Sequence, residues 1–230
     1  MSATSSPFVV TIDGPAGAGK STTARMLAQA LGYVFLDTGA IYRTVAFLAR
    51  TKNVAWDDAE PLGALAAAMD LRFEPGPPGQ GGVHVFANGT DVTAAIRTPE
   101  ISQGASRVSA HASVRDALLG LQRRMGASGR VVAEGRDTGT VVFPQAQAKF
   151  YLTADARVRA ERRAAELAAK GTPASVEETL KEIEERDARD SQRSVAPLRK
   201  ADDALEVDTG HAGPEQVVAQ LVKVVRSRGG

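Results

Sequence analysis

The sequence predicts an α/β protein whose core is a five-stranded parallel sheet flanked by helices. Five short apolar runs of the kind shown by buried strands are spaced along the chain, with helix-like segments between most of them. The first run leads directly into a glycine-rich stretch and then a helix-like segment, the order of strand, loop and helix that a phosphate-binding loop needs. The runs are FVVTID (8–13), YVFLDT (33–38), RVVAEG (130–135), AKFYLT (148–153) and ALEVDT (204–209).

The glycine-rich stretch GPAGAGKST (14–22) matches the pattern G-x-x-x-x-G-K-[ST]. Glycine lets several backbone N–H groups point inward at phosphate oxygens, Lys20 adds a positive charge near the β- and γ-phosphates, and Ser21 offers a hydroxyl to Mg²⁺. We therefore expect this loop to bind a nucleoside triphosphate. The binding residues are expected to be Gly14, Pro15, Ala16, Gly17, Ala18, Gly19, Lys20, Ser21 and Thr22.

A helix is expected directly after the loop. Met26, Leu27, Ala30 and Leu31 lie at helical spacing, and Gly32 stands where a glycine commonly ends a helix. The positive end of this helix adds to the anion site.

Acidic residues end four of the five apolar runs, each followed by Gly or Thr. In parallel sheets the active site lies at the carboxyl ends of the strands, so these acids are expected near the site. Acids are also ordinary turn formers at strand ends, so each one alone is a weak indication.

Residues 61–128 interrupt the alternation and are interpreted as an inserted α+β subdomain that binds the substrate, with an insert that has no such role as the alternative. LRFEP (71–75) and VHVFANG (83–89) predict a hairpin joined by the linker GPPGQGG (76–82). Two helices are expected after it, one capped by Thr98 with Pro99 at its first position and one over SVRDALLGLQRRM (113–125).

The rest of the chain is assigned around this insert. The expected divisions are a flexible tail at 1–7, a core at 8–60 and 129–230, and a short helical lid within the core at about 155–195. A packing helix is expected over PEQVVAQLVKVV (214–225), where Val217, Val218, Leu221, Val224 and Val225 share one face.

Composition excludes several function classes. The chain has 230 residues, a formal net charge of +1 and no cysteine, which argues against disulfides, thiolate metal sites and a strong general attraction to nucleic acid or membranes. Neither a signal peptide nor an apolar stretch long enough to span a membrane is found. We expect a cytoplasmic monomer without a nucleic acid or membrane partner.

Arginine clusters indicate what receives the phosphate. The N-K-x-D and D-x-x-G motifs of GTPases are absent, and none of the five runs ends in the Asp-Glu pair typical of motor and transport ATPases. Arginine instead accompanies acids and hydroxyl residues in LDTGAIYR (36–43), EGRDTGTVVFP (134–144) and ERDARDSQRSVAPL (185–198). Arginine suits phosphate because its planar fork binds two oxygens at once. Surface ion pairing, of Arg136 with Asp137 or Arg189 with Asp190, is the alternative for each cluster.

These motifs closely resemble those of the bacterial cytidylate kinases (CMP/dCMP kinases), members of the P-loop nucleoside monophosphate kinases. The resemblance covers essentially the whole chain and includes IRTPE followed by ASRVSAHASVRDAL (105–118). The D-G-F-P-R type segment of adenylate kinases is missing, and guanylate kinases lack the later motifs. The resemblance implies a P-loop kinase core, ATP as phosphoryl donor, Mg²⁺, and CMP or dCMP as acceptor.

The resemblance also implies roles for individual residues. Thr38 and Arg43 match family residues that contact the monophosphate, and Ser106 and Arg115 match residues that recognise cytosine. Arg136 corresponds to a phosphate-binding arginine, Asp137 to a base-binding aspartate, and Arg186, Asp190 and Arg193 to residues around the sugar and phosphates. Glu134 and Thr138 stand at positions that vary among relatives and receive no role.

The chemistry of cytosine agrees with this assignment. A carboxylate such as Asp137 accepts from the N4 amino group, and an arginine donates to N3 or O2. Uracil would place a carbonyl oxygen against the carboxylate, a mispairing that costs several kcal/mol. Simple pairing of Asp137 with Arg136 remains the alternative at this stage.

The expected mechanism is positioning with charge stabilisation. The acceptor phosphate is already ionised near neutral pH, so no strong general base is needed. Lys20, Arg136, Arg186 and Arg193 are the expected catalytic residues. Arg157, Arg159, Arg162 and Arg163 are lid arginines that could reach ATP, and a solvated helix face is the alternative for most of this segment. The rival hypotheses are a kinase for another monophosphate such as UMP, and a non-enzymatic ATP-binding switch.

Overall fold

A computed structural model gives the structure of the protein and describes residues 7–75, 83–127, 129–169 and 171–230. The chain forms two compact units, one of Met1–Asp37 with Arg123–Gly230 and one of Thr38–Gln122. The expected linker at 76–82 and all but the last residue of the expected tail at 1–7 lie outside the described residues.

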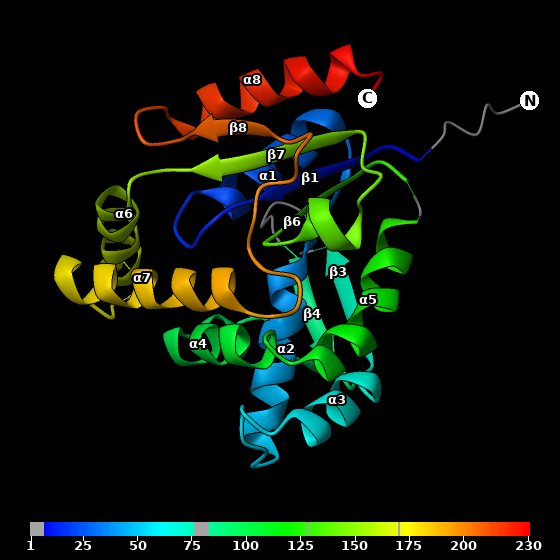
Figure 1. The fold of residues 1–230 in the computed structure, drawn as a ribbon, viewed down its shortest axis with the longest axis vertical. Coiled ribbons are helices and arrows are strands. Elements are labelled where there is room, and N and C mark those ends of the chain that lie inside the picture. Colours follow the sequence, from blue (N-terminus) through cyan, green and yellow to red (C-terminus); the bar gives the residue numbers. More distant parts are fainter. Residues whose placement is uncertain (1–6, 76–82, 128, 170) are drawn as a thin grey trace, which may run out of the picture. The chain divides into compact units, whose positions relative to one another are not determined.

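The first unit contains a five-stranded sheet in the order β2-β6-β1-β7-β8, and every pair in it is parallel. Figure 1 labels β6, β1, β7 and β8 of this sheet. This confirms the predicted sheet, and each of the five apolar runs contains one strand. The strands are β1 (Val9–Asp13), β2 (Val34–Asp37), β6 (Val131–Gly135), β7 (Ala148–Thr153) and β8 (Leu205–Asp208).

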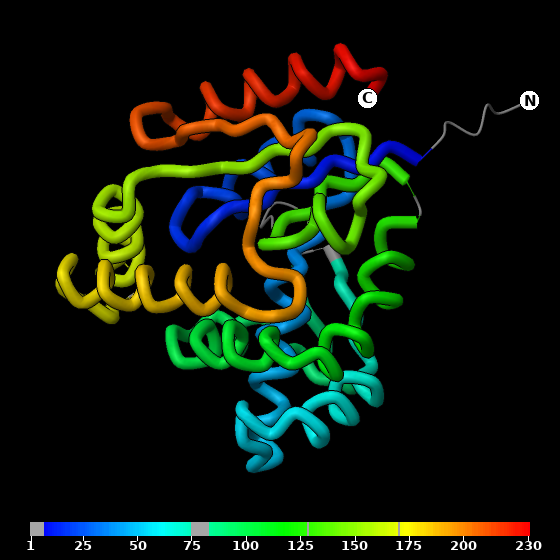
Figure 2. Tube along the Cα trace, in the orientation of Figure 1, coloured from blue at the N-terminus to red at the C-terminus, as the bar shows by residue number. Residues whose placement is uncertain are grey.

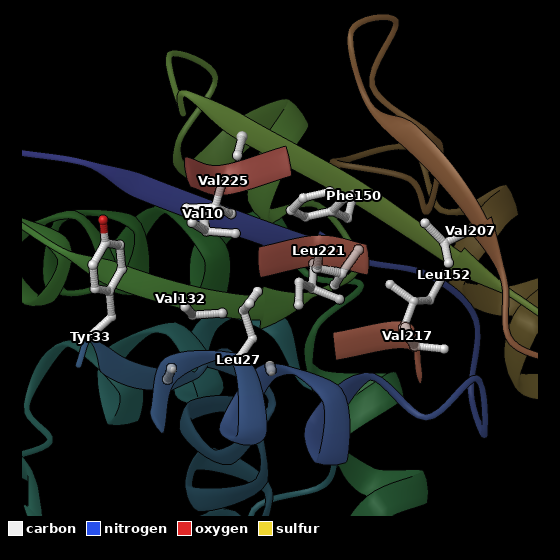
Figure 3. Close-up of a cluster of buried hydrophobic side chains, with 14 of the residues drawn as sticks. Val10, Leu27, Tyr33, Val132, Phe150, Leu152, Val207, Val217, Leu221 and Val225 are labelled. Atoms are coloured by element: carbon white, nitrogen blue, oxygen red, sulfur yellow. The ribbon is translucent and has the colours of Figure 1, made fainter. Parts of the chain in front are cut away.

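Two helices, α1 (Lys20–Leu31) and α8 (Pro214–Ser227), pack side by side against one face of this sheet. Figure 3 shows their apolar side chains, among them Leu27 and Leu221, against side chains of the strands such as Phe150. Since α1 is anchored along its length by this core, the loop that precedes it is held firmly at the carboxyl end of β1. Gly32 ends α1 in the left-handed conformation, as expected.

The opposite face of the sheet is covered by other parts of the unit. Leu36, Val131 and Ala133 form a second cluster there with Met125, near the end of α5 (Ala112–Gly126), and Phe143. Val131 and Ala133 face this side because side chains alternate along a strand, which places Val132 in the larger core around α1 and α8.

A helical hairpin of α6 (Ala156–Ala169) and α7 (Val176–Gln192) follows β7, and the chain then leads on to β8 (Figure 2). Ser175 caps α7 in a reciprocal arrangement with Glu178. Ala160 and Ile183 pack on Ala16 of the phosphate loop. The segment expected to form a lid is therefore in contact with the loop expected to bind the triphosphate.

The second unit combines helices with a small antiparallel sheet in the order β3-β4-β5. The predicted hairpin is present, but it gains a short third strand through a turn at Asn88 and Gly89, both with positive φ. Sequence reasoning missed this strand because it has only two residues. Thr98 caps the next helix as expected, accepting a hydrogen bond from the Ile101 N–H. The elements are α2 (Thr38–Thr51), α3 (Ala59–Ala67), β3 (Leu71–Pro75), β4 (Val83–Ala87), β5 (Thr90–Asp91), the 3₁₀ turn η1 (Ala95–Arg97), α4 (Pro99–Val108) and most of α5.

Two further expectations concern the whole chain. Within the residues that the structure describes, no helix combines the length and apolar character that crossing a membrane requires. The expected division into core, insert and lid stays a prediction. In the second unit, α2 packs against α3 and α4.

Candidate active site

The phosphate loop occupies the connection between β1 and α1, so the expected order of strand, loop and helix is confirmed. Gly14, Gly17 and Gly19 all have positive φ. A Cβ on Gly14 would lie 2.1 Å from the Leu152 carbonyl oxygen in the neighbouring strand β7, so only glycine fits there. Gly19 is the residue before α1, whose first N–H groups provide the anion-binding end of the helix.

Lys20 is buried, and its Nζ donates a hydrogen bond of 2.6 Å to the Pro15 carbonyl within the loop. Burial, together with the positive charge of Arg136, lowers the pKa of Lys20 to about 7. A phosphate anion brought to this ammonium group would favour its charged form. The loop therefore favours an anion beside Lys20, because an anion there stabilises the charged form of this group.

Ser21 lies next to an acid that sequence reasoning left without a role. Its hydroxyl donates a 2.6 Å hydrogen bond to Oε1 of Glu134, near the end of β6. Glu134 is buried, and its negative charge raises the pKa of Lys20, which opposes the lowering caused by burial. A hydroxyl and a carboxylate oxygen thus adjoin each other at the start of α1, and both are ligand types that Mg²⁺ accepts.

The turn after β6 and the end of α7 are joined by two ion pairs. Arg136 Nε lies 3.0 Å from Asp190 Oδ2, and Arg193 Nη2 lies 3.2 Å from Asp137 Oδ1. Arg186, one turn before Asp190 on α7, has its Nε 3.9 Å from the same Asp190 oxygen. Asp137 and Asp190 are buried, which sets these pairs apart from the surface pairing considered from the sequence.

The first unit thus brings together all of its predicted site residues. The positive charges of Arg136 and Arg186 both lower the pKa of Lys20, so these two arginines lie close enough to the phosphate loop to act on it electrostatically. Three guanidinium groups and an ammonium group gathered in this way suit the phosphates of nucleotides.

The other predicted residues belong to the second unit. Thr38 is the first residue of α2 and Arg43 lies in the same helix, Ser106 is on α4, and Arg115 is on α5. Thr38, Ser106 and Arg115 are buried.

Two of these residues are linked through a shared neighbour. Arg115 Nη1 donates to the Ser109 carbonyl at 3.2 Å, and the Ser109 hydroxyl donates to the Ser106 carbonyl at 3.0 Å. The Arg115 guanidinium also lies 5.4 Å from the centre of the Tyr42 ring. Buried polar groups fixed by such neighbours have the rigidity that recognition of a base requires.

Among the four lid arginines, Arg159 is buried and contacts the phosphate loop. Its Nη1 donates to the Ala16 carbonyl at 2.8 Å and pairs with Asp187 of α7, which also accepts from the Ala16 N–H at 3.0 Å. The other three bind elsewhere, Arg157 to Glu161 and Glu177, Arg162 to the Thr209 carbonyl, and Arg163 to Glu166.

Sequence reasoning gave no role to several acids that the structure places at the loop. Asp13, Glu134 and Asp187 each bind a group of the loop or of the turn beside it. The available indication was their position, since Asp13 and Glu134 belong to the acids at strand ends and Asp187 adjoins Arg186. Their position in the sequence did not show which hydrogen-bond donors these carboxylates contact.

The chain is similar to known proteins over nearly its whole length. The family described as Cytidylate kinase matches residues 10–227. A cytidylate kinase from Syntrophotalea carbinolica is 52% identical over 221 residues, covering 96% of this chain and 93% of that protein. One from Geobacter sulfurreducens is 48% identical over 221 residues, with 96% and 94% covered. A crystal structure of an uncharacterized protein from Eubacterium ventriosum has a TM-score of 0.53 at 9% identity, covering 96% of this chain and 99% of that one, which concerns the fold alone.

Proposed function

The chain belongs to the cytidylate kinase family, and we propose that it transfers the γ-phosphoryl group of ATP to CMP or dCMP, giving ADP and CDP or dCDP. The observation that carries this proposal is the gathering of Arg136, Arg186 and Arg193 with Lys20 around buried acids in one unit. A nucleotide switch needs a phosphate loop to bind its nucleotide, but it does not need further guanidinium groups to bind the phosphate of an acceptor.

The donor is ATP, held by the loop at residues 14–22. Backbone N–H groups at the start of α1 bind its phosphates, and Lys20 exchanges the Pro15 carbonyl for phosphate oxygens. Arg159 and Asp187 attach the α6–α7 hairpin to the same loop, so a movement of the loop on triphosphate binding would be transmitted to the hairpin. Closure of this hairpin over ATP would exclude water, the competing acceptor.

The acceptor is CMP or dCMP. Its phosphate is bound by Arg43 and Arg136, and its base by Ser106, Arg115 and Asp137. Thr38, Arg186, Asp190 and Arg193 complete the set around the sugar and phosphates. Since the acceptor oxygen is ionised at neutral pH, the residues supply position and positive charge rather than a general base.

Mg²⁺ is the ion that this chemistry uses, and the residues present fit it. We assign it to the Ser21 hydroxyl together with the triphosphate, with Glu134 beside that hydroxyl at 2.6 Å. When bound, the ion would neutralise part of the negative charge of the triphosphate. Glu134 orients the hydroxyl and contributes a negative charge near the ion.

Replacing Glu134 with Gln should therefore weaken the response to Mg²⁺. We expect the Mg²⁺ concentration for half-maximal activity to rise about tenfold, which is a usual effect of replacing a residue that supports a metal ligand. The measurement is a Mg²⁺ titration at saturating ATP and CMP. Glu206→Gln, which removes the charge of an exposed partner of Lys200, is the control and should leave the titration unchanged. An unaltered Mg²⁺ midpoint in Glu134→Gln would remove this role.

The proposed reaction is tested by following the γ-phosphoryl group itself. With ATP labelled in that group and CMP as acceptor, the label should appear in CDP, with little released as inorganic phosphate. Tight binding of ATP without labelled CDP would support the rival switch. Labelled UDP formed as readily as labelled CDP, when UMP replaces CMP, would support the broader pyrimidine kinase.

A further inference from the structure

The carboxylate of Asp13 is buried at the end of β1 and accepts three hydrogen bonds from one short segment. Its Oδ1 accepts from the Thr138 N–H and the Thr138 hydroxyl, each at 2.8 Å. Its Oδ2 accepts from the Gly139 N–H at 2.7 Å. All three donors belong to the start of η2 (Thr138–Val142), a short π-helical turn.

This carboxylate stands between the two parts of the proposed site. Asp13 precedes the phosphate loop directly, and Thr138 directly follows Arg136 and Asp137. β1 and β6 are paired in parallel with Asp13 opposite Gly135, so the two chains leave the sheet side by side. The carboxylate therefore ties the beginning of the ATP loop to the far end of the turn that carries Arg136 and Asp137.

A carboxylate is the one side chain of this size that suits these donors. An asparagine would turn its NH₂ group toward at least one N–H or O–H that now donates, leaving a buried polar group unsatisfied. The backbone has little room to adapt, because a Cβ on Gly139 would lie 2.8 Å from Thr11 Oγ1 and 3.3 Å from Asp13 Oδ2. Burial raises the pKa of Asp13 to about 6, so the group is still mostly ionised at neutral pH and able to accept all three bonds.

We propose that Asp13 is a positioning residue for the acceptor side, its carboxylate fixing the turn that holds Arg136 and Asp137 in register with the phosphate loop. This inference rests on the proposed function, and it adds a residue to which no acceptor role is otherwise assigned. Arg136 and Asp137 are also paired with Asp190 and Arg193 of α7. Asp13 holds the same turn from the side of the sheet, so the turn is fixed at both ends.

The first test is Asp13→Asn in the full chain. We expect the KM for CMP to rise about tenfold and kcat to fall up to about 10²-fold, because a small misplacement of reacting groups costs that much. The Kd for ATP, measured by calorimetry without CMP, should stay within about twofold, since the Asp13 carboxylate accepts from Thr138 and Gly139 and not from the loop amides that bind phosphate. Asp203→Asn, which removes the charge of an exposed partner of Lys149, is the matched control and should keep wild-type constants.

Thr138 provides a milder test that keeps Asp13 in place. Thr138→Val removes only the hydroxyl that donates to Asp13 and should raise the KM for CMP several-fold, whereas Thr138→Ser keeps the hydroxyl and should be close to wild type. The double variant Asp13→Asn with Thr138→Val should have a KM for CMP no higher, and a kcat no lower, than Asp13→Asn alone, since both changes act through one contact.

The outcomes separate this inference from the proposed function. A wild-type protein that makes no CDP would overturn the function itself. An active wild type whose Asp13→Asn variant keeps its kcat and its KM for CMP, or loses only ATP affinity, would overturn the positioning role. If Asp13→Asn fails to fold, the comparison of Thr138→Val with Thr138→Ser decides, and equal constants in those two variants would contradict the role.

Discussion

Lys20→Ala should abolish most of the turnover while the fold is kept. We expect kcat to fall about 10²- to 10³-fold, the loss seen when one group that stabilises developing charge is removed. Lys20 is buried against the Pro15 carbonyl, and in our account it leaves that carbonyl for the phosphates of ATP. The measurement is ADP release with CMP at saturating substrates, with circular dichroism to check the fold.

The chain offers a closely matched control for this variant. Lys149 is also buried and donates to the carbonyl of a proline five residues before it, Pro144, but it lies on β7 and pairs with Asp203. Lys149→Ala should lower the free energy of unfolding while turnover per folded molecule stays within a few-fold of wild type. Near-normal turnover of Lys20→Ala, or an equal fall in both variants, would argue against the donor site.

Asp137→Asn should change which base is accepted. Asp137 is assigned to the N4 amino group of cytosine, and an amide can instead donate to the O4 of uracil. We expect kcat/KM for CMP to fall about 10²-fold or more, while kcat/KM for UMP falls much less or rises. Both constants are measured on the same preparation, so any loss of folded protein cancels in their ratio.

The ion pair of Asp137 with Arg193 is the competing explanation for its burial. If the carboxylate served only that pair, the amide would disturb the turn and lower activity on both nucleotides alike. An equal fall for CMP and UMP would therefore refute the base-binding role. Asp203→Asn again serves as a control and should leave the ratio of the two constants unchanged.

The sheet was predictable because each strand carries its own local pattern. A short, mainly apolar run ending in an acid and then Gly or Thr marks β1, β2, β6 and β8, and the run over β7 is also mainly apolar. The cap at Thr98 and the end of α1 at Gly32 are likewise set by local chemistry. The two-residue strand β5 is too short for a pattern, and it is defined by its partner β4.

The contacts of the site were harder to predict because they join distant parts of the chain. Arg136 was considered with its neighbour Asp137, but the structure pairs it with Asp190, and Asp137 with Arg193. Ser21 meets Glu134 only because β6 lies beside β1 in the sheet. Sequence patterns identified the residue types that gather at the site, while the order of the strands decides which of them touch.

The most direct test of the central claim is a coupled ADP-release assay with CMP, dCMP, UMP, AMP and GMP as acceptors, carried out on the same enzyme preparation at fixed ATP and Mg²⁺. We predict that CMP and dCMP give the highest kcat/KM, that UMP is weaker by about 10²-fold or more, and that the purine nucleotides are inactive. ADP release that is equal with every acceptor, or unchanged when none is added, would contradict the account.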